Sequence, residues 1–277
     1  MSPLPVGLLC AALLAGSVAL SNPFAIAACA AAAGALLWAS PPPRAMYVWF
    51  AATSALLVFL VNPFVSVQGL TPIWSGPQIP LLDTEITQEE LVFGVAAGLR
   101  LIGSAMAVAA FVRLADGDRV LAALARVAPR SAMIAALASR LLPTLEQDAT
   151  GLAMASRSRA AQLHRRRPAA ALAAPLVGLS LERSLMLAEA MEARGYGGAA
   201  RTRTRTPQPG LNSPERVLTA IGIITCAVVA AAIPLDDYRY YDLLGDPFTT
   251  IGLSTAALVG LAGAAGAVTV RWARRAR

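Results

Sequence analysis

AMYVWFAATSALLVFLVN, residues 45–62, decides the class of this protein because it carries no charged side chain. A helix of this length rises about 27 Å at 1.5 Å per residue. That length is close to the roughly 30 Å thickness of a bilayer's hydrocarbon core. A helix that is apolar on every face is buried in protein or in lipid. We therefore predict a membrane-spanning helix over this run.

Five further apolar runs extend the prediction to an all-α polytopic membrane protein with about six transmembrane helices. The whole chain is 57% hydrophobic and 14% charged, with a mean hydropathy of +0.60. Soluble domains carry about 25% charged residues. We expect the first two of these runs to pair tightly across Ser21-Asn22-Pro23. The five runs are 4–20, 24–39, 91–112, 217–233 and 248–270.

The placement of the arginines predicts the orientation. All 23 basic residues are Arg, and 21 of them lie in the turn 41–44, in residues 113–216 and in the tail 271–277. Basic residues favour the cytoplasmic side of a membrane. We therefore expect a protein of the cell membrane with both termini in the cytoplasm. Because the first run has no basic segment before it and no cleavage signal, we expect it to be a retained helix.

This topology divides the chain into three parts. Residues 1–112 form a bundle of four transmembrane helices, 113–216 a cytoplasmic helical coupling domain, and 217–277 the last two helices with a basic tail. In the middle part the pattern predicts helices over 116–128, over 131–163 with a kink at Pro143, and over 168–194 with a second break at Pro175. The last of these helices is expected to stop at Gly195-Tyr196-Gly197-Gly198, a C-cap signal.

The composition excludes several functions. A chain without Lys cannot form a P-loop or use a catalytic Lys, so no nucleotide site is expected. The single histidine, His164, and three distant cysteines, Cys10, Cys29 and Cys226, do not suit a metal site. We expect no cofactor and no metal on this chain. Arginines on the inner face of a membrane favour contact with lipid headgroups over nucleic acid.

Two short motifs each place an arginine at the end of an expected cytoplasmic helix. They are Ser158-Arg159-Ala160 and Ala193-Arg194-Gly195. Each arginine ends a largely apolar helical stripe and has small neighbours, which allow a partner to approach closely. The stripes comprise Leu145, Ala149, Leu152, Ser156, Arg159 and Leu163 in the first helix and Arg183, Leu187, Ala190 and Arg194 in the second. A guanidinium can then donate several hydrogen bonds to a carboxylate or carbonyl of that partner. The alternative is two solvated arginines that only favour the helix dipole.

Residues 86–206 resemble the T component, the transmembrane coupling subunit, of energy-coupling factor (ECF) transporters. That family includes the Q subunit of cobalt and nickel importers. The second Ala-Arg-Gly motif of the family is matched most specifically. The stretches that carry the resemblance are Asn62-Pro63-Phe64, Ile86-Thr87-Gln88-Glu89-Glu90-Leu91-Val92-Phe93-Gly94, Gly98-Leu99-Arg100-Leu101, Ala138-Ser139-Arg140-Leu141-Leu142-Pro143 and Ala188-Glu189-Ala190-Met191-Glu192-Ala193-Arg194-Gly195-Tyr196-Gly197.

The resemblance implies a non-catalytic subunit that couples partner ATPases to uptake of a vitamin or metal ion. Two P-loop ATPase subunits, a homodimer or a heterodimer, hold ATP and Mg²⁺, and a separate S component captures the solute. Two crossing helices insert their Ala-Arg-Gly motifs into the ATPases. Arg194 matches the second motif, and Arg159 matches the first by its arginine alone because Ala160 replaces glycine. Arg157 is a rival for the first position.

Other charged residues leave alternatives open. Arg100 lies within the fourth run, where a charge marks a transport role or a structural anchor. The aspartates near residue 240 suggest a metal site or an interfacial loop on the outer side; they are Asp236, Asp237, Asp242 and Asp246. An acidic outer loop is expected to be solvated, and the alternative is that it attracts cations; its residues are Asp83, Glu85, Glu89 and Glu90. A stand-alone permease and a membrane-embedded transferase are the alternative functions.

Overall fold

The computed structural model describes residues 1–42, 45–65, 71–75, 85–158, 168–196, 210–240 and 248–275. The chain forms two compact units, one of Met1–Val120 with Leu211–Arg277, and one of Leu121–Gly210. We call the first the bundle and the second the α6–α7 unit. The division of the chain into 1–112, 113–216 and 217–277 stays a prediction.

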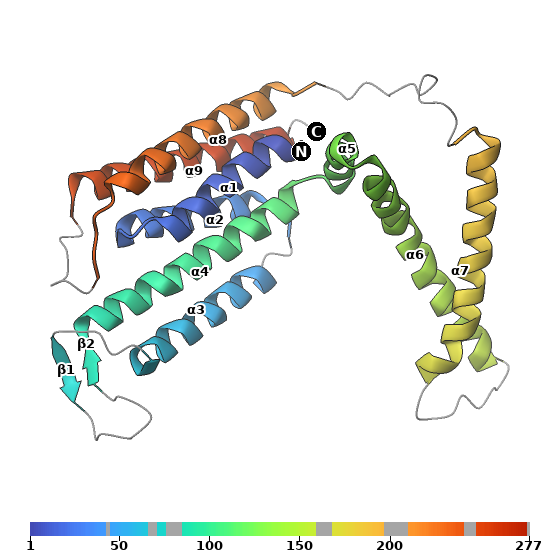
Figure 1. The fold of residues 1–277 in the computed structure, drawn as a ribbon, viewed down its shortest axis with the longest axis horizontal. Coiled ribbons are helices and arrows are strands. Elements are labelled where there is room, and N and C mark those ends of the chain that lie inside the picture. The colour runs from blue at the N-terminus through green and yellow to red at the C-terminus, as the bar shows by residue number, and fades with distance from the viewer. Residues whose placement is uncertain are drawn as a thin grey trace. The chain divides into compact units, whose positions relative to one another are not determined.

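The described residues are helical apart from one short hairpin (Figure 1). The hairpin pairs β1 with β2 in antiparallel register, and the prediction of an all-α chain did not include it. The elements of the chain, in order, are α1 (Pro3–Ala19), α2 (Pro23–Ala39), α3 (Ala45–Val65), β1 (Pro72–Ser75), β2 (Glu85–Thr87), α4 (Gln88–Leu114), α5 (Gly117–Val127), α6 (Pro129–Ser158), α7 (Pro168–Ala193), α8 (Ser213–Ala232), the 3-10 turn η2 (Ile233–Leu235) and α9 (Thr250–Arg275).

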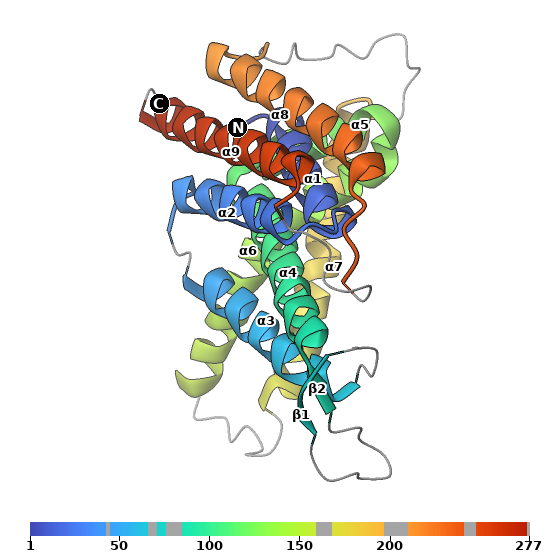
Figure 2. The same ribbon diagram turned by 90° about the vertical axis from the view of Figure 1, so that its left-hand side faces the viewer.

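Two short helices, α1 and α2, form the centre of the bundle. Helix α2 packs between α9 and α4, and α1 packs against α8 and α4 (Figure 2). Their side chains, such as Leu13, Ile26 and Ala33, are fully buried. Helix α3 contacts α4 and leaves most of its apolar surface exposed. Most apolar side chains of α3 are therefore left uncovered by the described residues, as suits a helix that faces lipid.

In the described part of the chain, four helices are long and apolar enough to cross a membrane: Ala45–Asn62, Gln88–Leu114, Ser213–Leu235 and Thr250–Arg275. Helices α1 and α2 are apolar but have 17 residues each. Because other helices surround them, their length is set by packing more than by lipid. A multi-pass membrane protein is therefore supported, and the count of six crossings stays a prediction.

Arginines from two longer helices bind the end of α2. Arg113 of α4 donates to the carbonyls of Pro41 and Pro42, each at 2.8 Å. Arg274 of α9 donates to the carbonyl of Ala39 at 2.8 Å. The last carbonyls of a helix have no partner within it, and cations favour its C-terminal end. Arg274 therefore satisfies the last carbonyl of α2, and Arg113 fixes the segment that follows the helix.

Glu89 and Glu90 are buried, which corrects the expectation that both lie in a solvated loop. Their side chains are 1% and 0% exposed. Glu90 forms a capping box with Thr87, in which its backbone N–H donates to the Thr87 hydroxyl and its carboxylate accepts from the Thr87 N–H at 3.3 Å. Glu89 accepts from the Thr71 hydroxyl at 2.7 Å. Both carboxylates thus fix the start of α4 beside the hairpin.

The α6–α7 unit follows the predicted helices with one correction. Helix α7 is continuous through Pro175, so the expected break there is wrong. This proline is the eighth residue of the helix, so it removes the one hydrogen bond that its N–H would donate to the carbonyl four residues earlier, without ending the helix. Helix α6 is also continuous through Pro143. The expected extension of this helix to residue 163 lies outside the described residues.

Candidate functional site

The C-terminal end of α7 is a Schellman motif built on the second arginine motif. Ala193 is the last helical residue, Arg194 follows as the cap, and Gly195 adopts a φ of 76°. The Gly195 N–H donates to the carbonyl of Glu192 at 2.8 Å, and the Tyr196 N–H donates to the carbonyl of Met191 at 2.9 Å. A Cβ at residue 195 would meet no atom within 4 Å. Glycine is therefore favoured here by backbone conformation, since only glycine adopts this φ without strain.

The Arg194 side chain lies exposed at this helix end. None of the residues that the structure describes forms a hydrogen bond or ion pair with its guanidinium. The small residues Ala193 and Gly195 flank it and are also exposed. The motif thus presents five N–H donors beside a surface that a partner can approach closely.

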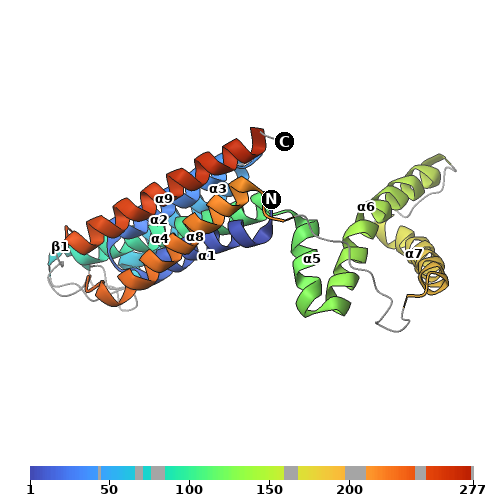
Figure 3. The same cartoon turned by 90° about the horizontal axis from the view of Figure 1, so that it is seen from above.

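Helices α6 and α7 contact each other and run in roughly opposite directions (Figure 1), and they cross when seen from above (Figure 3). Arg183 of α7 donates to Asp148 of α6 at 2.6 Å. Nearer the C-terminal end of α7, the Tyr196 hydroxyl contacts the sulfur of Met133. Neither pairing was predicted from the sequence. Opposite charges on the two helices were the available signal, but the sequence alone does not show which residues meet.

The predicted stripes occupy the contact between the two helices only in part. On α6, the predicted face is half-buried, and it comprises Leu145, Ala149, Leu152 and Ser156. On α7, Arg183 and Leu187 are half-buried, whereas Ala190 and Arg194 are exposed. The stripe of α7 therefore leaves the helix contact before it reaches the arginine, so Arg194 remains accessible.

The first motif lies mostly beyond the described part of the chain. Ser158 is the last residue of α6, and Arg159 and Ala160 fall outside the described residues. Arg157 lies in the last turn of α6. The choice between Arg157 and Arg159 stays a prediction.

The ion pair of Asp148 and Arg183 is expected to stabilise the crossing modestly. Their side chains are 23% and 39% exposed, and partly exposed pairs are worth about 0.5–1 kcal/mol. We expect the amides of α7 near Arg183 to exchange about two- to fivefold faster in Asp148→Asn and in Arg183→Gln. The double variant should exchange no faster than the single variants. Hydrogen exchange by mass spectrometry measures this, and additive effects would contradict a direct pair.

Arg100 binds the end of α1. Its Nη2 donates to the carbonyl of Leu20 at 3.0 Å, and its guanidinium carbon lies 5.9 Å from the centroid of the Tyr240 ring. The Tyr240 hydroxyl donates to the carbonyl of Ser21. Burial raises the pKa of Tyr240 to about 12, so the hydroxyl stays protonated. This geometry matches a structural anchor, and a direct transport role for Arg100 stays untested.

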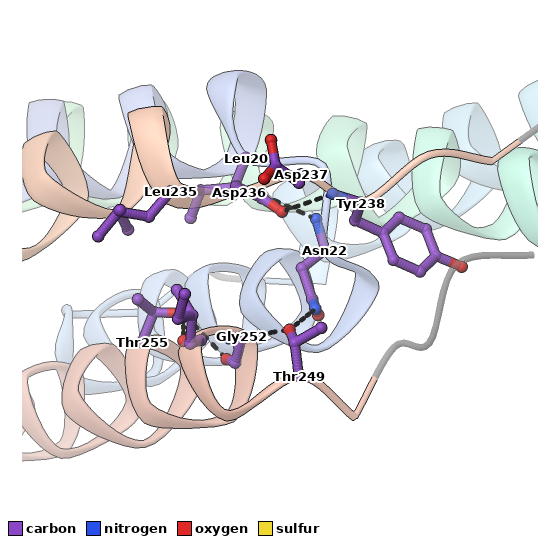
Figure 4. A pocket seen from close by; sticks show the side chains of 11 residues that line it. Leu20, Asn22, Leu235, Asp236, Asp237, Tyr238, Thr249, Gly252 and Thr255 are labelled. Atoms are coloured by element: carbon purple, nitrogen blue, oxygen red, sulfur yellow. Dashed lines mark hydrogen bonds between the residues drawn. The ribbon is translucent and has the colours of Figure 1, made fainter.

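A cavity of about 200 Å³ lies where the α1–α2 turn meets the segments beside η2 and α9 (Figure 4). Asp236 accepts from the backbone N–H groups of Ser21 at 2.6 Å and of Asn22 at 3.0 Å. The Asn22 amide donates to the Thr249 hydroxyl at 3.4 Å. Asp236 therefore fixes a turn.

In the described part of the chain, the aspartates considered for a metal site do not lie together as a set of metal ligands. Asp236 binds backbone N–H groups, as above, and Asp237 is exposed. Within the described ranges, no group of three or more His, Cys, Asp or Glu side chains is placed to hold a metal ion. Asp242 and Asp246 lie outside these ranges.

Comparison with known protein families identifies the chain. Residues 6–206 match the CbiQ family, which is described as a cobalt transport protein. The chain belongs to the CbiQ family. This confirms the resemblance to the T components of ECF transporters. No curated protein matches the chain in a direct sequence comparison.

Membership of the CbiQ family makes this chain a membrane component of an ECF-type transport system. The match begins within α1 and ends after the second arginine motif, so it includes both motifs, 158–160 and 193–195. Membership of a transport-protein family favours a non-catalytic role for this membrane component. Helices α8 and α9 lie beyond the matched residues.

Proposed function

We propose that this chain is the coupling subunit of an ECF-type importer. In this role it transmits the ATP-driven motion of two P-loop ATPase subunits to an S component that captures the solute. The observation that carries the proposal is the exposed Arg194 on the Schellman motif of α7. A guanidinium at a fixed backbone position, with no partner among the described residues, suits insertion into another protein.

The crossing of α6 and α7 supports the mechanical part of the proposal. The ion pair between Asp148 and Arg183 ties the two helices together beside their contact. A displacement applied at Arg194 therefore moves both helices instead of bending one of them. Two packed surfaces that move as rigid bodies are a common basis of switching transitions.

The proposal places α6 and α7 in the cytoplasm, where ATP is available. The arginine distribution supports this orientation, with both termini on the same side. The ATPases, as a homodimer or a heterodimer, bind ATP and Mg²⁺. The S component selects the solute, a vitamin or a metal ion, and the description of the family favours cobalt.

Purification from the native membrane tests the proposal. The tagged chain in mild detergent should bring with it two P-loop ATPase chains and at least one small membrane protein. Proteoliposomes of the purified assembly should import the solute only when ATP is present. A chain that carries no ATPase and still transports a solute alone would establish the permease instead.

A further inference from the structure

Glu215, in the first turn of α8, is a buried carboxylate that three separate chain segments share. Its side chain is 2% exposed. It accepts from the backbone N–H and the hydroxyl of Ser2, each at 2.8 Å. It also accepts from Nη1 of Arg119 at 3.1 Å and from the backbone N–H of Asn212 at 3.3 Å. Both carboxylate oxygens are thus occupied.

Arg119 reinforces this cluster from the start of α5. The same Nη1 that binds Glu215 also donates to the Ser2 hydroxyl at 2.7 Å. Its Nε lies 4.0 Å from the carboxylate of Asp116, one turn earlier. Hydrogen bonds to a charged group are stronger than neutral ones. The guanidinium therefore joins α5 to both Ser2 and Glu215.

These residues lie beside the two places where the chain passes between the bundle and the α6–α7 unit. The chain leaves the bundle after Val120 and returns to it at Leu211. Arg119 lies one residue before Val120, where the chain leaves the bundle, and Asn212 lies one residue after Leu211, where it returns. One carboxylate therefore holds both connections between the bundle and the α6–α7 unit, and holds them to the start of α1 through Ser2.

We infer that Glu215 and Arg119 are positioning residues for energy coupling. The inference rests on the proposed function. A connection whose bundle end is fixed passes a displacement of the α6–α7 unit to the start of α1, which Ser2 caps, and to α8, which carries Glu215. A connection released at this point behaves as a flexible linker and absorbs part of that displacement. The pair acts through the backbone that it fixes and touches no solute.

Two variants and one control test this role in the complete complex. Glu215→Gln removes the charge and keeps the size of the side chain, and Arg119→Gln removes the cation from a site that is 33% exposed. Asp118→Asn is the matched control, because it neutralises an exposed carboxylate next to Arg119. The measurements are recovery of the ATPases, the rate of ATP hydrolysis, and the number of solute molecules imported per ATP.

We expect both variants to recover the ATPases within about twofold of the unaltered complex and to import about tenfold less solute per ATP. The control should match the unaltered complex in all three measurements. A merely structural role would lower recovery and hydrolysis together and leave the ratio of import to hydrolysis unchanged. Folded variants with an unchanged ratio overturn the inference. If Glu215→Gln does not fold, Arg119→Gln decides.

A measurement on the chain alone separates this inference from the proposed function. In detergent, the amides around residues 119 and 212 should exchange about fivefold faster in either variant than in the control. Unchanged exchange overturns the inference, whatever the ATPases do. An unaltered chain that recovers no ATPase contradicts the proposed function, and the exchange rates then still show whether Glu215 holds both connections.

Discussion

Arg194→Glu is expected to lower the recovery of ATPase with this chain by about 30-fold or more. The guanidinium is exposed at a fixed helix end, and the proposed contact buries it against acceptors of the partner. Removing one member of a buried interfacial charge pair costs about 2–5 kcal/mol, and 2 kcal/mol corresponds to about 30-fold in affinity. Reversing the charge adds repulsion. Co-purification at fixed expression, followed by a titration with purified ATPase, measures the effect.

Arg130→Glu is the matched control for this prediction. Arg130 is an exposed arginine of the same unit, in the first turn of α6. The charge change is identical, and an acidic residue near a helix N-terminus is favourable. We expect recovery of the ATPases within about twofold of the unaltered chain. Equal losses in the two variants would show a general effect of charge and would remove Arg194 from the proposed contact.

The first motif allows the same test on two rival arginines. Arg159→Glu should weaken ATPase recovery, and combining it with Arg194→Glu should abolish it. Arg157 lies about 160° around the helix from Arg159 if the helix continues, so only one of them can face the same partner groove. A larger loss in Arg157→Glu than in Arg159→Glu would assign the first contact to Arg157.

The sequence predicted the helices well because apolar runs and prolines have strong local effects. Helix α3 extends the predicted run 45–62 by the apolar residues 63–65, and α4 extends the run 91–112 by three polar residues at its start and by Arg113 and Leu114 at its end. The glycine stop of α7 was also predicted, because Gly195 needs a positive φ that few other residues adopt. Each of these features depends on neighbouring residues alone.

The roles of charged residues were harder to predict, because they depend on distant partners. The sequence could not show that Arg100 meets the carbonyl of Leu20, 80 positions away. Glu90 was expected in solvent although Thr87, three residues earlier, is a capping-box partner, and the capping pattern was the missed signal. The cluster at Glu215 joins residues 2, 119, 212 and 215. A capping box connects 212 with 215, but no local pattern connects these two with residues 2 and 119.

The second large effect is expected at the contact between α2 and α9. Gly263 of α9 is buried against Ala32 of α2. A Cβ at residue 263 would lie 2.2 Å from the Ala32 Cβ and 2.7 Å from its Cα. Neither atom belongs to a flexible side chain, so the two helices themselves would have to separate. Small residues permit this close backbone approach between membrane helices.

Gly263→Ala should therefore destabilise the bundle, because overpacking usually costs about 1–3 kcal/mol. The higher helix propensity of alanine offsets up to about 1 kcal/mol of that cost. Gly263→Leu should prevent the pairing of α2 with α9 and give a chain that is not recovered in folded form. Gly260→Ala is the matched control on the same helix, because its Cβ would meet no atom within 4 Å.

Thermal unfolding in detergent compares the variants, and the loss of monodisperse protein is the quantity measured. We expect Gly263→Ala to unfold several degrees below the unaltered chain and Gly260→Ala to unfold at the same temperature or slightly above it. Equal unfolding temperatures for the two alanine variants would mean that α9 does not approach α2 as closely as the structure has it. Because α2 and α9 pack against each other within the bundle, a lower stability of Gly263→Ala should reduce its yield without changing the import per ATP of the molecules that fold. That ratio distinguishes this packing contact from the positioning role of Glu215.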